Sequence, residues 1–225
     1  AHLDFAKKWG PINVNRFFTP VEGYPSIAEV RKEPHQQYNI GGNWHTDHSY
    51  DQIPALGSML YAKELPKVGG DTLFAGCAAA FDTLSEGMKS TLRSLRAVHS
   101  SRHVFGKSAA IPDDMADLFG NADKALQDAE HPVVIKHPLS GRETLYVNPG
   151  FTTRFVGWTE KESNSLLAFL YEHISRPEHT YRFQWSKGAL AFWDNRATWH
   201  LAVNDYPGET RLMHRITIEG EPLEP

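Results

Sequence analysis

The sequence predicts a mainly β fold, a sandwich or barrel, with a few helices packed outside it. The sequence is rich in turn-forming residues, with 14 Pro and 17 Gly among 225 residues. Phe, Trp and Tyr make up 12% of the chain. Many short segments with strand character lie between turn signals, whereas few segments carry the helical period. These observations favour strands over a helical bundle.

The N-terminal half opens with a short helical pattern and continues mainly as strands. The helix is indicated by Leu3, Phe5, Ala6 and Trp9. The predicted strands are Ile12–Phe18, Ser26–Val30, Gly57–Ala62 and Thr72–Phe74, the last after a Gly-Gly turn. Cys77–Leu95 is predicted to be helical, with a break around Ser85-Glu86-Gly87.

The C-terminal half alternates one helix with further strands. Val133–Lys136 and Thr144–Val147 flank a Pro-Leu-Ser-Gly turn and predict a hairpin. Thr159 and Glu162 form a capping box, which predicts a helix that ends before Pro177. The last predicted strands are Tyr181–Trp185, Ala189–Trp193, Trp199–Val203 and Leu212–Ile218.

We expect residues 1–225 to form a single domain, because no linker, repeat or low-complexity segment divides them. Residues 106–131 show little periodicity and are predicted to be a loop or lid. The chain opens directly in a helical pattern at Ala1, so we expect further residues to precede it.

Composition narrows the expected partners. The net charge is −4, and Lys and Arg are dispersed, so no nucleic-acid footprint is expected. No apolar run has the length of a membrane span. Cys77 is the only cysteine, which excludes an intrachain disulfide and suits the cytoplasm.

The chain contains 12 His, and one of them begins a candidate metal motif. In an extended strand, residues i and i+2 share a face, so His45 and Asp47 can reach one ion together. His200 is the best candidate for a third ligand. Two His and one carboxylate leave open positions, as in non-haem Fe(II) sites. His2-Leu3-Asp4 repeats the motif, but it lies in a helical pattern and is interpreted as a solvated helix end.

Two arginines follow His200 on one predicted strand. Arg211 and Arg215 share a face with Met213, and burying such charges is costly unless they meet anions. The planar guanidinium suits a carboxylate. The alternative is that both arginines are structural salt-bridge partners. A metal beside two anion sites fits an oxoacid cosubstrate together with an acidic substrate.

Several long blocks, in order, carry a resemblance to a known family. They are Asn43–Asp47, Ala62–Pro66 with Gly69–Thr72, Val147–Arg154, and Trp193–Asn195 through Arg215. In these blocks the chain resembles the TauD/TfdA family of Fe(II)- and 2-oxoglutarate-dependent dioxygenases. The resemblance implies a double-stranded β-helix, or jelly roll, and a hydroxylation that yields succinate and CO₂.

By position, the resemblance makes His45, Asp47 and His200 the iron ligands. It implies that Arg211 pairs with the distal carboxylate of 2-oxoglutarate and that Thr72 hydrogen-bonds this cosubstrate. For Thr72 the alternative is an ordinary strand residue after a turn. Arg215 resembles the residue that meets the substrate's acidic group.

On the substrate side, the chain departs from the members that cleave taurine. Their substrate-binding histidine falls on Asn15, a nearby tyrosine on Phe18, and a pocket asparagine on Gly41. We therefore expect a larger, less polar anion of the aryloxyalkanoate, alkyl sulfate or sulfonate type. Phe151, with His48, Tyr50 and Phe105, is a candidate lining residue, although aromatic residues in β cores more often only pack.

Three other functions remain open. Taurine cleavage with release of sulfite is the alternative within the family. A zinc hydrolase would use the same ligands but would leave both arginines without a purpose. A non-catalytic binding module would not need the open metal positions. By analogy with related enzymes, we expect a homo-oligomer acting on a small anion and O₂.

Overall fold

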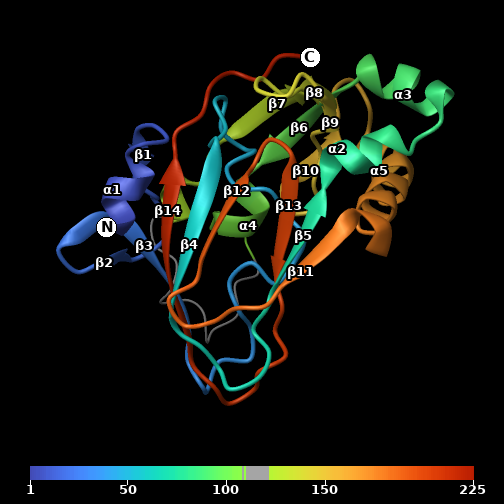
Figure 1. The fold of residues 1–225 in the computed structure, drawn as a ribbon. Helices are drawn as coiled ribbons and strands as arrows, with labels where there is room; N and C mark the ends of the chain where they lie inside the picture. The colour runs from blue at the N-terminus through green and yellow to red at the C-terminus, as the bar shows by residue number, and fades with distance from the viewer. Residues whose placement is uncertain (108, 110–121) are drawn as a thin grey trace.

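The computed structural model describes residues 1–107, 109 and 122–225, and these form antiparallel sheets with few helices (Figure 1). The strands are β1 Ile12–Asn13, β2 Pro20–Val21, β3 Tyr24–Lys32, β4 Gly57–Glu64, β5 Thr72–Gly76, β6 Arg96–Ser100, β7 Asp128–Pro132, β8 Val134–Lys136, β9 Glu143–Leu145, β10 Thr152–Phe155, β11 Thr180–Phe183, β12 Leu190–Asp194, β13 Thr198–Ala202 and β14 Arg211–Ile218. The helices are α1 His2–Ala6, α2 Cys77–Asp82, α3 Glu86–Arg93, α4 Arg102–Phe105 and α5 Glu160–Ile174, with 3₁₀ turns η2 Ala122–Lys124 and η3 Pro177–His179.

The largest sheet runs in the order β12-β4-β14-β3-β2, with β1 also paired to β14. A second sheet has the order β11-β5-β13, and a third the order β10-β6-β7. Strands β8 and β9 form a separate two-stranded sheet. This pairing confirms the hairpin that the turn predicted. Together these sheets confirm the predicted mainly β jelly roll with flanking helices.

The first two sheets pack against each other through an apolar cluster. Leu60, Met213 and Trp193 of the large sheet contact Phe74 of β5 and Phe183 of β11. Trp193 and Phe74 lie with their ring centroids 5.4 Å apart. This packing holds β4 and β14 in a fixed position relative to β13, which carries His200.

A second core lies between α5 and the sheets. Leu167, Leu170 and Ile174 of α5 pack with Phe81 and Trp199, and Figure 1 shows α5 outside the strands. The helix begins at the predicted capping box: the Thr159 hydroxyl accepts from Glu162 N at 3.3 Å, and the Glu162 carboxylate accepts from Thr159 N at 2.8 Å. The prediction of this helix is confirmed.

The prediction for Ile12–Phe18 was mostly wrong. Only Ile12 and Asn13 form a strand. The Asn15 side-chain oxygen accepts hydrogen bonds from Phe17 N at 2.8 Å and Phe18 N at 3.0 Å. A turn of this kind satisfies the backbone locally and ends the strand.

Residues 108 and 110–121 of the predicted lid lie outside the described residues. The C-terminal part of that segment is not a loop, because η2 and β7 fall within it. β7 pairs with β6. The sequence pattern predicted neither of these two strands. Among the described residues, no helix has the length and apolar character needed to cross a membrane.

Candidate metal and anion site

His45 and His200 lie directly opposite each other on neighbouring extended segments. His45 N donates to His200 O at 3.1 Å, and His200 N donates to His45 O at 2.9 Å. Their ring centroids are 4.1 Å apart. His45 forms only this isolated bridge and Asp47 lies in a turn, so the predicted strand for the H-x-D motif is wrong. The bridge nevertheless brings the two imidazoles onto one side.

Asp47 completes a group of three side chains that could bind a metal. Its Oδ1 lies 3.6 Å from His45 Nε2, and its Oδ2 lies 3.7 Å from His200 Nε2. One ligand atom from each of the three side chains lies within 4.8 Å of the others. Within the described ranges, this is the one group of at least three His, Cys or acidic side chains that converges in this way.

The protonation states suit a cation. Burial lowers the pKa of both His45 and His200, which keeps the imidazoles neutral with a lone pair to donate. Burial alone would raise the pKa of Asp47, but the charges around it, the Arg215 guanidinium foremost, outweigh burial and hold this pKa well below its ordinary value. His45 Nδ1 donates to Asn43 O at 2.8 Å, which leaves Nε2 as the free ligand atom. Two neutral imidazoles and one carboxylate fit Fe(II).

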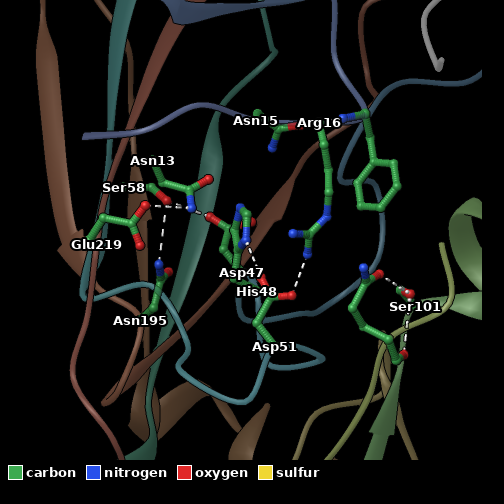
Figure 2. Close-up of polar contacts among 12 residues, drawn as sticks. Asn13, Asn15, Arg16, Asp47, His48, Asp51, Ser58, Ser101, Asn195 and Glu219 are labelled. Carbon is green, nitrogen blue, oxygen red and sulfur yellow. Dashed lines mark hydrogen bonds and ion pairs between the residues drawn. The ribbon is translucent and has the colours of Figure 1, made fainter. Parts of the chain in front are cut away.

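Contacts of His48 and Asp51 stabilise the turn that follows Asp47. His48 has φ 59°, the only positive φ of a non-glycine residue in the described part of the chain. Its Nδ1 donates to Asp51 Oδ2 at 2.9 Å, and Asp51 also pairs with Arg16 (Figure 2). These contacts fix the turn that carries Asp47.

Arg211 is a buried cation that lies beside this metal group without a carboxylate partner. It is 4% exposed, and no acidic side chain of the described residues lies within 4.0 Å of it. Burial lowers its pKa. Its Nε donates to Gly70 O at 2.9 Å, and one Nη reaches Thr72 Oγ1 at 3.5 Å. The rest of the guanidinium edge remains available for an anion.

Trp185 orients Thr72, a contact that sequence reasoning missed. The Trp185 indole N–H donates to Thr72 Oγ1 at 3.0 Å. Since both Trp185 and Arg211 are donors here, the hydroxyl proton of Thr72 is free to donate elsewhere. Trp185 stood at the end of a predicted strand, but its distant partner left no signal in the local pattern.

Arg215 lies on the same strand and pairs with Asp47. Its Nη2 is 2.9 Å from Asp47 Oδ2, and its guanidinium lies 5.7 Å from the centre of the Phe18 ring. Its Nε is buried and finds no hydrogen-bond partner among the residues that the structure describes. The salt-bridge alternative therefore describes part of what Arg215 does in this structure.

One cavity joins these groups. Its lining includes His45, His200, Thr72, Trp193, Arg211 and Arg215. Asn15, Phe18 and Phe151 lie outside this lining, although Phe151 packs 6.3 Å from His45, ring centre to ring centre. Their roles as substrate contacts stay predictions.

The profile of the family described as "Taurine catabolism dioxygenase TauD, TfdA family" matches residues 1–217. The chain belongs to this family. Its members depend on Fe(II) and 2-oxoglutarate, so the chain is an oxidoreductase of the dioxygenase class.

Relatives with known names share most of the chain. An alkylsulfatase of Acinetobacter baylyi is 38% identical over 220 residues, which are 96% of this chain and 68% of the relative. An alpha-ketoglutarate-dependent sulfate ester dioxygenase of Pseudomonas putida is 34% identical, over 98% of this chain and 74% of the relative. The structure of a taurine dioxygenase from Burkholderia xenovorans superposes with a TM-score of 0.79 at 33% identity, covering 98% of this chain and 72% of that one.

Proposed function

We propose that this chain hydroxylates a small organic anion, and that its substrate is an alkyl sulfate ester. The observation that carries the proposal is one cavity lined by two buried arginines and by the two histidines that converge with Asp47. A metal-dependent oxidation of one anion with a second anion as cosubstrate needs these features together.

The ligands of Fe(II) in this proposal are His45, Asp47 and His200. Bound Fe(II), with 2-oxoglutarate and O₂, supplies the oxidant that replaces a substrate C–H by C–OH, with succinate and CO₂ as co-products. The protein contributes binding, orientation and the exclusion of water. The three ligands need no acid–base role.

Arg211 and Thr72 are proposed to bind the distal carboxylate of 2-oxoglutarate. Arg211 Nε is already engaged by Gly70 O, so the carboxylate would bind at the Nη groups, beside the Thr72 hydroxyl that one of them reaches at 3.5 Å. The Thr72 hydroxyl, turned by the Trp185 N–H, donates to the same carboxylate. The bound carboxylate would thereby offset the cost of burying the Arg211 guanidinium, which has no acidic partner among the described residues.

Arg215 is proposed to bind the sulfate group of the substrate while remaining close to Asp47. An apolar cluster of Phe17, Phe18, Tyr50, Phe105 and Phe151 adjoins the site through Phe18, which lies 5.7 Å from the Arg215 guanidinium, and Phe151, which lies 6.3 Å from the His45 ring. An alkyl chain would pack against this cluster better than the short taurine molecule. The names of two similar relatives, an alkylsulfatase and a sulfate ester dioxygenase, support this choice.

Hydroxylation of the carbon that bears the sulfate oxygen explains how an oxidation cleaves the ester. The product carries hydroxyl and sulfate on one carbon, and it collapses to an aldehyde and sulfate. The hydroxyl proton leaves as the C–O(sulfate) bond breaks, so no hydrolytic base is required. This favours the oxidation over a zinc hydrolase, for which both arginines would lack a purpose.

Taurine cleavage is the second candidate, and the name of the family and of one superposed structure favours it. Against it, the position of the substrate-binding histidine holds Asn15, whose side-chain oxygen is used by two backbone N–H groups.

The proposal is tested by succinate formation from Fe(II)-loaded protein given O₂, 2-oxoglutarate and a substrate panel. The panel holds medium-chain alkyl sulfates, alkyl sulfonates, aryloxyalkanoates and taurine. We expect succinate and inorganic sulfate in equal amounts with an alkyl sulfate, and none in His45→Ala. Sulfite from taurine as the dominant product would replace the proposed substrate, and sulfate without succinate would indicate a hydrolase.

Three broader expectations accompany this proposal: a single domain over residues 1–225, a homo-oligomer, and action in the cytoplasm. The family match across nearly the whole chain supports the first. The buried free thiol of Cys77 is compatible with a reducing compartment. The oligomer rests on analogy with related enzymes, and sedimentation would measure it.

A further inference from the structure

The two oxygens of the Asp47 carboxylate have different surroundings. Oδ2 accepts a hydrogen bond from Ser58 Oγ at 2.7 Å and forms an ion pair with Arg215 Nη2 at 2.9 Å. Among the described residues, no hydrogen bond reaches Oδ1. The carboxylate of Asp47 is therefore held through Oδ2, and no donor of the described chain competes for the lone pairs of Oδ1.

The direction of the Ser58 hydroxyl follows from its neighbours. Asn195 Nδ2 lies 3.4 Å from Ser58 Oγ, and Arg215 Nη2 lies 3.5 Å from it. Both of these nitrogens are donors, so Asp47 is the one acceptor among the three groups. Figure 2 shows Ser58 between Asp47 and Asn195.

The orientation of Asn195 is also fixed. Its Oδ1 accepts the Trp193 indole N–H at 3.0 Å, which turns its amide nitrogen toward Ser58. Its backbone oxygen accepts from Thr46 Oγ1 at 2.6 Å, in the residue just before Asp47. Asn195 thereby ties the turn that carries the metal ligand to the strand that carries Ser58.

Burial and strand pairing make this contact rigid. Ser58 is 0% and Asn195 1% exposed, so water does not compete for either side chain. Ser58 lies in the centre of the large sheet, where β4 pairs it with Trp193 of β12 and Thr217 of β14. A hydroxyl held in this way is pre-organised for one acceptor.

We propose that Ser58 is a positioning residue of the metal centre, whose hydroxyl binds Oδ2 of Asp47 and fixes the orientation of this carboxylate beside His45 and His200. The inference rests on the proposed ligand role of Asp47. Hydrogen bonds to metal-ligating carboxylates typically change metal affinity or activity by about 10–100-fold when they are removed. Arg215 pairs with the same oxygen, but its guanidinium would be shared with the substrate anion, whereas the Ser58 hydroxyl donates to Asp47 alone.

The test is the rate at which Fe(II)-loaded protein releases its metal to an excess of chelator under anaerobic conditions. Ser58→Ala removes only the hydroxyl, and we expect release to become about tenfold faster or more. Ser163→Ala is the matched control. Ser163 is also 0% exposed, and its hydroxyl bonds Thr159 O at 2.9 Å and Phe155 N at 3.0 Å, with no contact to a ligand. We expect its release rate to match the wild type.

Melting temperatures with and without Fe(II) provide a second readout. Without metal, both variants should lose similar stability, because each loses one buried hydroxyl. With metal, only Ser58→Ala should show a reduced Fe(II)-induced shift. Equal release from Ser58→Ala and wild type, or equally fast release from both variants, would overturn the role of Ser58. A wild-type protein that retains no Fe(II) would instead overturn the proposed function.

Discussion

At the scale of single residues, Arg211 is buried and pairs with no acidic side chain of the described residues. The cost of burying a guanidinium is repaid only when an anion arrives. We expect Arg211→Met to melt at or above the temperature of the wild type when 2-oxoglutarate is absent. Its affinity for 2-oxoglutarate should fall by at least about 30-fold, because truncating one partner of a buried charge pair costs about 2–5 kcal/mol.

Differential scanning fluorimetry with and without 2-oxoglutarate measures both effects. The account predicts that the ligand-induced rise in melting temperature disappears in Arg211→Met. A variant that is strongly destabilised on its own, yet still stabilised by 2-oxoglutarate, would make Arg211 a structural residue and contradict its proposed role.

At the scale of elements, the Gly69-Gly70 turn brings β5 against Arg211. Gly70 has φ +70°, and a Cβ built there would lie 3.2 Å from Arg211 Cδ. Gly141 has φ +69° in the β8-β9 hairpin, and a Cβ there would meet nothing within 4 Å. The two positions share the backbone strain but differ in what surrounds them.

We expect Gly70→Ala and Gly141→Ala each to lower the free energy of unfolding by about 1 kcal/mol, from the left-handed backbone alone. Only Gly70→Ala should weaken 2-oxoglutarate binding, because its methyl group displaces the Arg211 side chain. Denaturant unfolding and calorimetric titration separate the effects. Equal affinity in both variants would show that the turn does not position Arg211.

The sequence pattern predicted the buried face of β14 but not the turn at Asn15. The alternation in β14 predicted that Arg211, Met213 and Arg215 share a buried face, and all three are buried. Local pattern could not predict that Asn15 ends its strand by accepting from Phe17 and Phe18, because polar residues also occur in strands. The resemblance supplied Thr72, which has an ordinary strand environment by pattern alone.

The contacts that sequence reasoning missed are long-range. Ser58 and Asn195 are 137 residues apart, and Trp185 and Thr72 are 113 apart. The strand pattern showed only that Ser58 is a polar residue within an apolar strand. That pattern does not identify Asp47 or Asn195 as the residues that Ser58 contacts. Such pairs are set by how sheets pack, which local periodicity does not encode.

At the scale of the whole molecule, buried histidines couple stability to pH. Burial first, and then the nearby His131, lower the pKa of His99 well below 6.5. Burial likewise lowers the pKa of His131. As pH falls below about 6.5, these two histidines become protonated in the unfolded chain but stay neutral in the folded protein. The unfolded state therefore binds more protons, and the free energy of unfolding decreases.

We therefore expect the free energy of unfolding to fall between pH 7 and pH 5, and His99→Phe to reduce that slope. Each histidine contributes at most about 1.4 kcal/mol per pH unit. Denaturant titrations across this range measure the slope. An unchanged slope in a folded His99→Phe protein would show that His99 does not contribute to acid sensitivity.

The whole-molecule claim is that the metal group and Arg211 form one composite site for 2-oxoglutarate. Calorimetric titration of 2-oxoglutarate under anaerobic conditions tests it most directly, with metal-free and Fe(II)-loaded protein compared. We expect one 2-oxoglutarate to bind per chain in the Fe(II)-loaded protein, and this binding to be lost without metal or in Arg211→Met. Equal binding with and without Fe(II), or none in either state, would contradict it.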